Sequence, residues 1–304
     1  MSPDTPVSTP GIAGERPHPG GSLSLAGRVV SRVGYGAMQL ERLRGDGAAA
    51  ITLVRRAVDL GVNHFDTAQF YGNGFSNSVL RQALSPADDA LIVSKVGAEP
   101  NPDGRPPLRL AQRPEELRAS VENNLTSLGL DRIPLVNLRR AENNSRVLAE
   151  GDQVVDFDDQ LATMIALRDE GKIGGIGLSS VTLDRVRHAL PAGIVCVQNA
   201  YSLVARGDED LLDLCVSEGI AWVPFFPLGS ALPTLPKATN EPAVEDAAQR
   251  LGCTPSQVAL AWLLRHTPNT LLIPGTADLD HLEANVAAGD IHLDDKTVAV
   301  LDSI

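Results

Sequence analysis

Residues 48–72 read AAAITLVRRAVDLGVNHFDTAQFYG, and this stretch contains the unit from which the rest of the fold is built. Apolar residues recur at helical spacing over 48–60, and Gly61 follows as a helix breaker. Asn63–Asp66 is then a short β-prone run that ends in a carboxylate. Similar runs recur along the chain, each followed by a longer stretch with helical periodicity. This alternation predicts an α/β fold with a parallel sheet and helices outside it.

Eight strands are predicted, which is the number that closes a (β/α)₈ TIM barrel. They are Val33–Gly36, Asn63–Asp66, Leu91–Lys95, Leu135–Arg139, Gly175–Ser179, Val195–Gln198, Ala221–Phe225 and Leu271–Ile273. The periodicity predicts helices over 48–60, 76–84, 114–128, 158–170, 182–189, 208–218, 255–265, 279–288 and 294–303.

The N-terminal part precedes the first repeated unit. Residues 1–21 contain five prolines and four glycines, a composition that favours a disordered tail. Leu23 and Leu25 then alternate with serines, and Ala26-Gly27-Arg28 favours a turn before Val29. We therefore expect a β-hairpin that plugs the floor of the barrel, with residues 22–304 forming one barrel domain.

Composition excludes several classes of partner. The chain of 304 residues has 26 Lys and Arg against 38 Asp and Glu, for a formal net charge of −12. This charge disfavours nucleic acid and anionic membranes. The sequence shows no long apolar window or signal-peptide pattern, so a cytoplasmic protein is expected.

The remaining composition signals concern thiols and metals. Cys196, Cys215 and Cys253 are widely spaced, as expected for reduced buried thiols. No His/Cys/Asp cluster has metal-ligand spacing, so no metal is predicted. No pattern defines an oligomeric state.

Charged residues end three of the predicted strands: Asp66, Lys95 and Arg139. Reactive groups of parallel barrels gather at the C-terminal ends of the strands, so these side chains converge if each points inward. Tyr71 lies five residues past Asp66, in a loop short enough to fold its phenol over the barrel mouth. A nearby ammonium favours a phenolate, so Lys95 is predicted to lower the pKa of Tyr71 while Asp66 pairs with Lys95. The alternative is an ordinary buried Asp66–Lys95 pair beside a loop aromatic.

The stretch Gly61–Gly72 resembles the signature of the aldo-keto reductase family, and further matches follow in order to the C-terminus. These are Val93-Ser94-Lys95, Gly171-Lys172-Ile173, Ile176-Gly177-Leu178-Ser179, Val197-Gln198-Asn199, Pro227-Leu228-Gly229 and Ile273-Pro274-Gly275-Thr276. The resemblance covers about residues 22–304. It implies a (β/α)₈ barrel that binds NADPH in extended form and reduces an aldehyde or ketone to an alcohol.

Within that resemblance, Asp66, Tyr71 and Lys95 match three of the four catalytic residues, with Tyr71 as the proton donor. Arg139 stands where most relatives carry histidine. Arginine cannot be deprotonated at working pH, but it can donate hydrogen bonds to a developing alkoxide. Its alternative role is a salt bridge to an acidic loop residue such as Glu142.

Three segments are similar to a bacterial branch of the family that includes pyridoxal reductases: Gly34–Gln39, Val136–Arg139 and Val223–Gly229. Pyridoxal carries an ionisable phenol beside its aldehyde, and a guanidinium can pair with that oxygen. A pyridoxal-type aromatic aldehyde is therefore a candidate small-molecule substrate.

The resemblance also implies a set of cofactor-binding positions. Ser179 and Gln198 match residues that hold the nicotinamide carboxamide, and Ser180 stands where many relatives carry asparagine. Phe225 matches the aromatic residue that stacks on the nicotinamide, and Leu228, Gly229 and Ser230 match the pyrophosphate loop.

The last group of cofactor candidates, at the adenosine phosphate, consists of Gly275, Thr276, His281 and Asn285. Relatives often carry Lys and Arg where this chain has Gly275 and His281, so the charge available for a 2′-phosphate is reduced. The resemblance implies NADPH, with NADH as the alternative. Ordinary helix capping by Thr276 or Asp278 is the competing interpretation of this segment.

Two other functions compete with reduction. Lys95 at a strand end is suited to forming a Schiff base, as in lyase barrels. Alternatively, the altered fourth position marks a nicotinamide-cofactor-sensing regulatory subunit. The intact Asp66, Tyr71 and Lys95 favour the reductase.

Long connections follow three strand ends, at 96–112, 140–157 and 229–240, and are expected to rim the barrel mouth. Arg105, Arg109 and Arg140 in these loops are candidates to guide an anionic ligand, with solvated surface roles as the alternative.

Overall fold

The computed structural model describes residues 18–304, apart from 102–103, 105–107, 141, 143–147 and 230–235. Its strands are β1 (Ser22–Leu25), β2 (Arg28–Ser31), β3 (Tyr35–Gly36), β4 (His64–Asp66), β5 (Leu91–Val96), β6 (Ala98–Pro100), β7 (Leu108–Leu110), β8 (Ile133–Arg139), β9 (Ile173–Ser179), β10 (Ile194–Gln198) and β11 (Ala221–Trp222). Its α-helices are α1 (Gly47–Asp59), α2 (Phe75–Ala83), α3 (Pro114–Leu128), α4 (Phe157–Asp169), α5 (Leu183–Ala189), α6 (Glu209–Ser217), α7 (Pro242–Leu251), α8 (Pro255–His266), α9 (Leu279–Ala287) and α10 (Asp295–Asp302).

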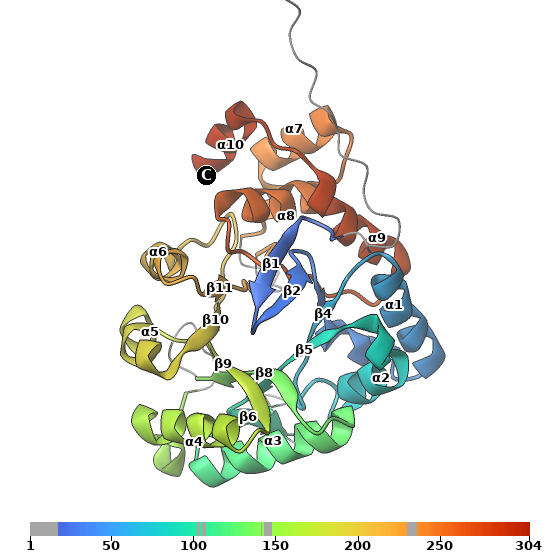
Figure 1. Cartoon of the computed structure of the whole chain (residues 1–304). Coiled ribbons are helices and arrows are strands. Elements are labelled where there is room, and N and C mark those ends of the chain that lie inside the picture. Colours follow the sequence, from blue (N-terminus) through green and yellow to red (C-terminus); the bar gives the residue numbers. More distant parts are fainter. Residues whose placement is uncertain (1–17, 102–103, 105–107, 141, 143–147, 230–235) are drawn as a thin grey trace, which may run out of the picture.

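The central sheet is parallel and curls into a ring. Seven strands follow the order β11-β10-β9-β8-β5-β4-β3, so each strand lies beside its successor in the barrel. Residues 270–272 close the ring, because Thr270 bridges to Trp222 and Leu272 bridges to Val33. Helices surround this ring in Figure 1. The expected (β/α)₈ barrel is confirmed.

The closing segment is shorter than the sequence predicts. Leu271–Ile273 forms isolated bridges instead of a regular strand, although Leu272 N donates to Arg32 O and Leu271 N to Trp222 O at 2.8 Å. Proline explains why the regular strand ends early, because proline has no backbone N–H to donate to a neighbouring strand. Pro274 follows this segment directly. Pro224 likewise stops β11 at Trp222, short of the predicted Phe225.

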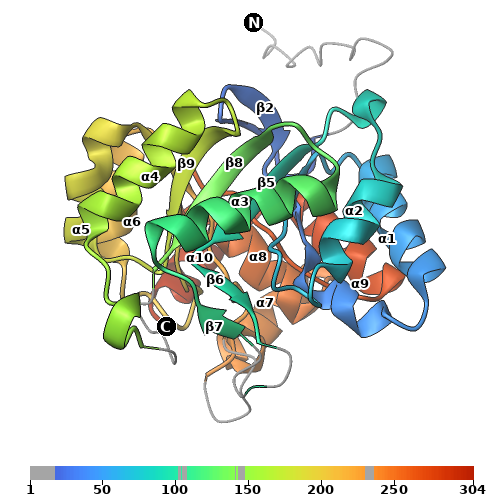
Figure 2. The ribbon, with the colours of Figure 1, turned by 90° about the horizontal axis from the view of Figure 1, so that it is seen from below.

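The N-terminal hairpin plugs the barrel as predicted. β1 and β2 pair antiparallel, and Figure 1 shows them inside the ring of strands. Leu25 and Val30 pack against inward-facing barrel residues that include Leu91, Leu135 and Leu271. In Figure 2 this hairpin lies at the end of the barrel opposite the β6–β7 hairpin.

Shortening one plug residue tests this packing. Leu25 is only 2% exposed, so Leu25→Ala is expected to lower the free energy of unfolding by about 2–5 kcal/mol through lost burial and a cavity. Val29 in the same hairpin is 59% exposed, and Val29→Ala is expected to change stability by less than about 0.5 kcal/mol. Urea unfolding measures both variants, and equal losses would show that the hairpin does not act as a packed plug.

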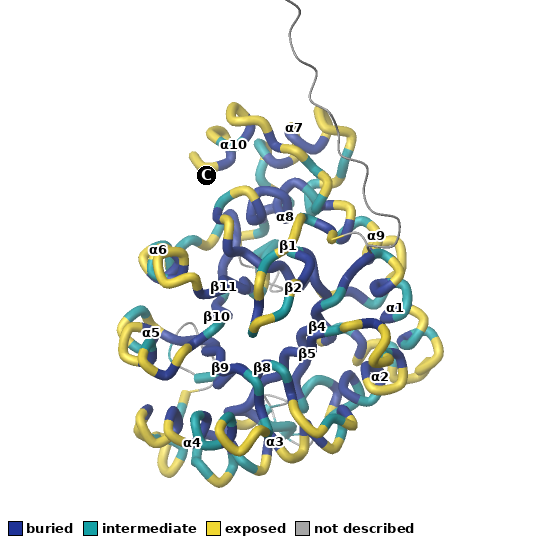
Figure 3. Tube along the Cα trace, viewed as in Figure 1, coloured by how far each residue is buried: buried dark blue, intermediate teal, exposed yellow. Residues whose placement is uncertain are grey.

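The helices begin and end where local chemistry predicts. In α8, Thr254 accepts from the backbone N–H of Gln257, whose side chain in turn accepts from Thr254, and Pro255 occupies the first turn. In α3, Pro114 takes the same position and Gly129 ends the helix with a left-handed backbone. Figure 3 shows that the strands are buried and that the outer faces of the helices are exposed.

Two elements of the fold were not predicted from the sequence. Helix α7 has Pro242 at its start and Gly252 at its end, signals that were present in the sequence. The antiparallel β6–β7 hairpin lies within the connection 96–112 that was expected to be a loop.

The structure also bears on membrane insertion and on the state of the thiols. Among the described residues, no helix has the length and apolar character needed to span a membrane. Cys196 and Cys215 are buried free thiols as expected, whereas Cys253 is half-buried.

Candidate active site

A buried ion pair joins the ends of β4 and β5. Lys95 Nζ lies 2.5 Å from Asp66 Oδ1 and also donates to the backbone oxygen of Thr67 at 3.2 Å. The other Asp66 oxygen accepts from Gln198 Nε2 at 2.9 Å. Asp66 and Lys95 are 2% and 5% exposed, so both charges are almost completely removed from water. Each charge is therefore stabilised by a partner and not by solvent.

Tyr71 lies beside this ion pair. The Lys95 ammonium is 4.9 Å from the centroid of the Tyr71 ring, so the positive charge lies directly beside the phenol. The loop carrying Tyr71 folds back through short backbone hydrogen bonds, among them Tyr71 N to Ala68 O at 3.0 Å. The predicted convergence of Asp66, Lys95 and Tyr71 is thus found in the structure.

Lys95 acts on the pKa of Tyr71 in the predicted direction, but the net shift of this pKa is upward. Burial raises the pKa of Tyr71 above its ordinary value of 10.0, because the phenolate loses its hydration. The positive charges of Lys95 and Arg139 act in the opposite direction but do not outweigh burial. Tyr71 is therefore fully protonated at neutral pH, as a proton donor must be.

Arg139 completes the group at the end of β8. Its charge interacts with Tyr71, and its Nη1 atom is buried without a hydrogen-bond partner among the described residues. Burial lowers the pKa of Arg139 from its ordinary value of 12.5. A guanidinium still carries its charge at neutral pH, so a buried cationic donor faces the site.

The alternative partner for Arg139 is engaged elsewhere. Glu142 Oε1 pairs with Arg140 at 2.6 Å and with Arg185 at 3.1 Å. The same two guanidinium groups lie over the ring of Phe157. The described residues therefore contain no Arg139–Glu142 salt bridge. Arg140 instead belongs to a cluster at the rim with Glu142, Arg185 and Phe157.

The candidate nicotinamide residues lie at neighbouring strand ends. Ser179 and Ser180 are buried at the end of β9, where Ser180 has a positive φ of 56°. Gln198 ends β10, and its Oε1 atom is buried with no hydrogen-bond partner in the described part of the chain. Gln198 was predicted from the sequence to bind the cofactor only. The structure shows that its Nε2 atom also holds Asp66.

The next cofactor candidates follow β11. Phe225 is half-buried and packs edge-to-face on Phe226, with ring centroids 5.2 Å apart. Leu228 and Gly229 are half-buried, and Leu228 O accepts from Ala238 N at 3.1 Å. Gly229 has a φ of 92°, a conformation that favours glycine. Ser230 lies outside the described residues.

The segment expected at the adenosine phosphate is held partly by helix capping. Asp278 caps α9 by accepting from His281 N at 2.9 Å, as the competing interpretation proposed. Thr276 is buried, and its backbone oxygen accepts from the Tyr35 hydroxyl at 2.6 Å. Gly275 and the His281 side chain are exposed, while Asn285 is half-buried. Tyr35 anchors this segment and was not anticipated from the sequence.

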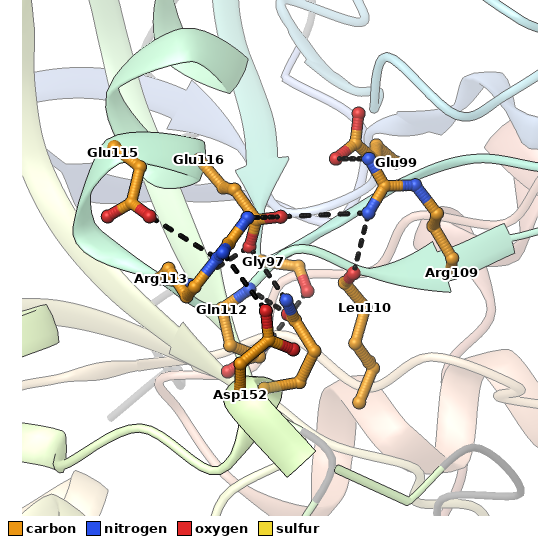
Figure 4. A network of polar contacts seen from close by, with 10 residues as sticks. Gly97, Glu99, Arg109, Leu110, Gln112, Arg113, Glu115, Glu116 and Asp152 are labelled. Atoms are coloured by element: carbon orange, nitrogen blue, oxygen red, sulfur yellow. Dashed lines mark hydrogen bonds and ion pairs between the residues drawn. The ribbon is translucent and has the colours of Figure 1, made fainter. Parts of the chain in front are cut away.

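The rim beside the β6–β7 hairpin is a network of paired charges (Figure 4). Arg109 lies 2.6 Å from Glu99 and 3.6 Å from Glu116, and Arg113 lies 2.9 Å from Glu116. Gln112 joins this rim to the site because its Nε2 donates to Gly97 O and Arg139 O. Because Arg109 is neutralised by carboxylates, a role in guiding anions is not supported. Arg105 lies outside the described residues.

A surface hollow lies in the same region. It has a volume of about 570 Å³ and is lined by residues that include Gln69, Glu99, Arg109 and Glu116. None of Asp66, Tyr71, Lys95 and Arg139 lines it. This hollow is therefore distinct from the strand-end site. Among the described residues, no group of three or more His, Cys, Asp or Glu side chains has the arrangement of a metal site.

This fold and the tyrosine–lysine–aspartate arrangement together define the class of the protein, which is a barrel oxidoreductase. The model of the aldo/keto reductase family matches residues 32–304, and the chain belongs to that family.

Individual relatives support the assignment. The chain is 42% identical to a pyridoxine 4-dehydrogenase of Escherichia coli (strain K12), over 93% of this chain and 98% of the relative. It is 35% identical to an uncharacterized oxidoreductase of Schizosaccharomyces pombe, over 93% and 89%. The crystal structure of an aldo-keto reductase from Klebsiella pneumoniae in complex with NADPH has a TM-score of 0.77 and 25% identity, covering 93% and 94%.

Proposed function

We propose that this enzyme reduces an aldehyde or ketone to an alcohol with NADPH, using Tyr71 as the proton donor. The observation that carries the proposal is the contact of Tyr71 with the buried Lys95–Asp66 pair at the C-terminal ends of β4 and β5. When bound, NADPH supplies the hydride that the carbonyl carbon accepts.

The chain's own residues supply the proton and stabilise the charge. Tyr71 gives its hydroxyl proton to the carbonyl oxygen, and the Lys95 ammonium then lies beside the resulting phenolate. Burial works against the charged form of Lys95, but the negative charges of Asp66 and of ionised Tyr71 outweigh it and raise the pKa of Lys95. Asp66 is in turn held by Gln198. Lys95 therefore stays positively charged throughout the proton transfer.

The residues at the strand ends fit a nicotinamide cofactor. The buried Gln198 Oε1 lacks a partner among the described residues and can accept from a carboxamide N–H. Ser179 supplies a buried hydroxyl, and Phe225 a half-buried aromatic face. The relative from Klebsiella pneumoniae was crystallised with NADPH, which supports the same cofactor here.

The Schiff-base alternative is disfavoured by the state of Lys95. Nucleophilic attack on a carbonyl needs a neutral amine, whereas the ion pair with Asp66 raises the pKa of Lys95. Borohydride trapping of a carbonyl substrate on Lys95, without nicotinamide, would support the lyase instead. A regulatory subunit would bind NADPH without turning over any carbonyl.

We further propose a pyridoxal-type aromatic aldehyde as the substrate. Oxidation of a pyridoxine alcohol at position 4 gives an aldehyde, and one relative is named for that reaction. The ring of such an aldehyde carries an ionisable phenol next to the carbonyl. Arg139 offers a buried Nη1 donor that has no hydrogen-bond partner among the described residues, so it can form a charge-assisted hydrogen bond with that oxygen.

Replacing Arg139 tests this pairing. Arg139→Met is expected to raise KM for pyridoxal by about 10–100-fold, since hydrogen bonds to charged groups contribute about 1.5–3 kcal/mol. The KM for benzaldehyde, which lacks the phenol, is expected to change much less. Arg140→Met is the matched control because Arg140 pairs with Glu142 on the rim. An unchanged preference for pyridoxal in Arg139→Met and Arg139→His would contradict the pairing.

A direct assay tests the proposed activity itself. NADPH and NADH absorbance is followed with a panel of carbonyls that includes pyridoxal, benzaldehyde and a simple aliphatic ketone. We expect oxidation of NADPH that depends on the carbonyl. Binding of NADPH with no turnover on any member of the panel would favour the regulatory alternative.

A further inference from the structure

A buried polar network lies behind the site, on the side of the sheet that faces α2 and α3. Its members are Thr67, Gln69, Asn77, Ser94, Asn124 and Ser127. Thr67, Asn77, Ser94 and Asn124 have no measurable exposure. Polar side chains removed from water to this degree destabilise a fold unless they are hydrogen-bonded. Here they bond to each other across four elements of the barrel.

Asn77, near the start of α2, is the centre of the network. Its Oδ1 accepts from the Thr67 hydroxyl at 2.7 Å. Its Nδ2 lies within 3.0 Å of three acceptors, which are Asn124 Oδ1 at 3.0 Å, Gln69 Oε1 at 2.9 Å and Ser127 Oγ at 2.9 Å. One amide therefore connects the loop after β4 with helix α3, using both of its functional atoms.

The network reaches the catalytic group through the backbone at three places. Thr67 follows Asp66 in sequence, and its backbone oxygen accepts from Lys95 Nζ at 3.2 Å. Ser94 precedes Lys95, and its hydroxyl donates to Asn124 Oδ1 at 2.7 Å. Gln69 lies two residues before Tyr71 and accepts from Ser127 Oγ at 2.7 Å. The same set of hydrogen bonds thus restrains the segments that carry Asp66, Lys95 and Tyr71.

We propose that Asn77 is a positioning residue, which holds the 67–71 loop so that the Tyr71 hydroxyl stays next to Lys95. Asn77 acts from behind the sheet through Thr67 and Gln69. The proposal rests on the proposed function, since it requires Tyr71 to be the proton donor. A misplacement of about 1 Å in a reacting group can lower a rate by about 100-fold, so a loosened loop is expected to slow proton transfer.

The first test is Asn77→Ala in the full-length enzyme. We expect kcat to fall by about 10–100-fold, while Kd for NADPH and KM for the carbonyl change less than about twofold. Val79→Ala on the same helix is the matched control. Val79 is buried in the core, and its apolar side chain takes no part in the hydrogen-bond network. It is expected to lower Tm and leave kcat within about twofold. If both variants lose Tm and kcat in parallel, Asn77 has only a structural role and the proposal is wrong.

A more conservative substitution tests the proposal if the Asn77→Ala variant does not fold. Thr67→Val keeps the shape of the side chain and the backbone oxygen that binds Lys95, and it removes only the hydrogen bond to Asn77. We expect a fall in kcat of about 3–10-fold in a folded protein. A folded Thr67→Val enzyme with wild-type kcat would overturn the proposal.

A double-mutant cycle separates this proposal from the proposed function. If Asn77 acts through Tyr71, Asn77→Ala has almost no further effect on kcat in a Tyr71→Phe background. If Tyr71→Phe alone retains its activity, the proposed function fails whatever Asn77 does. A third outcome is that Tyr71→Phe loses kcat as expected, but Asn77→Ala still lowers kcat by the full 10–100-fold in that background. In that case the proposed function holds and only the positioning role of Asn77 fails.

Discussion

Tyr71→Phe is expected to lower kcat for carbonyl reduction by about 10²–10⁴-fold, which is the usual contribution of a positioned general acid. The substitution removes only the hydroxyl, so the Lys95–Asp66 pair stays intact. Steady-state kinetics with NADPH and the best carbonyl of the panel measures the loss, and fluorescence titration shows whether Kd for NADPH is unchanged.

Tyr201→Phe provides the matched control for this experiment. Tyr201 is buried and donates its hydroxyl hydrogen to Glu209 at 2.6 Å, but it is not one of the strand-end site residues. We expect Tyr201→Phe to reduce stability and leave kcat close to wild type. Retention of most of the activity in Tyr71→Phe would show that another group donates the proton.

Lys95→Met is expected to have the second-largest effect, on both stability and rate. It leaves the Asp66 carboxylate, which is 2% exposed, without its cation. Removing one partner of a buried ion pair typically lowers the free energy of unfolding by about 3–5 kcal/mol. It also removes the charge that stabilises ionised Tyr71, so kcat is expected to fall by about 10²-fold or more. Urea unfolding and single-turnover kinetics measure the two effects separately.

The double variant Lys95→Met/Asp66→Asn distinguishes the two roles of the pair. A neutral amide at position 66 can still accept from Gln198 Nε2, so much of the lost stability is expected to return. The rate is not expected to return, because the ammonium is still absent. Recovery of activity together with stability would mean that the pair is only structural.

The parts of the site that the sequence predicts are those fixed by strand geometry. Asp66, Lys95 and Arg139 each lie at the end of a β-prone run, and parallel strands bring such ends together. The plug hairpin was likewise predictable, because Leu23 and Leu25 alternate with serines and Gly27 favours the turn, where it takes a positive φ of 77°. Helix boundaries agree within one or two residues because caps such as Thr254 and Pro255 are local signals.

The parts that the sequence could not predict depend on tertiary contacts. The pKa of Tyr71 rises because of burial, and burial is a property of the assembled barrel. Glu142 lies three residues from Arg139, yet it pairs with Arg140 and with Arg185 from another element. Asn77 carries no sequence signal of its own, since its partners Thr67 and Asn124 are brought to it only by packing of α2 and α3.

The central claim is that a protonated Tyr71, beside a positively charged Lys95, donates the proton. Its most direct test is the pH dependence of the single-turnover reduction rate, followed by stopped-flow pH jumps in wild type and Tyr71→Phe. Since burial raises the pKa of Tyr71 above 10.0, the acid form persists through neutral pH. The wild-type rate is expected to stay level to about pH 10 and fall above it, and this alkaline fall is expected to be absent from the slow Tyr71→Phe enzyme. A wild-type fall between about pH 6 and 8, or the same alkaline fall in Tyr71→Phe, would contradict the account.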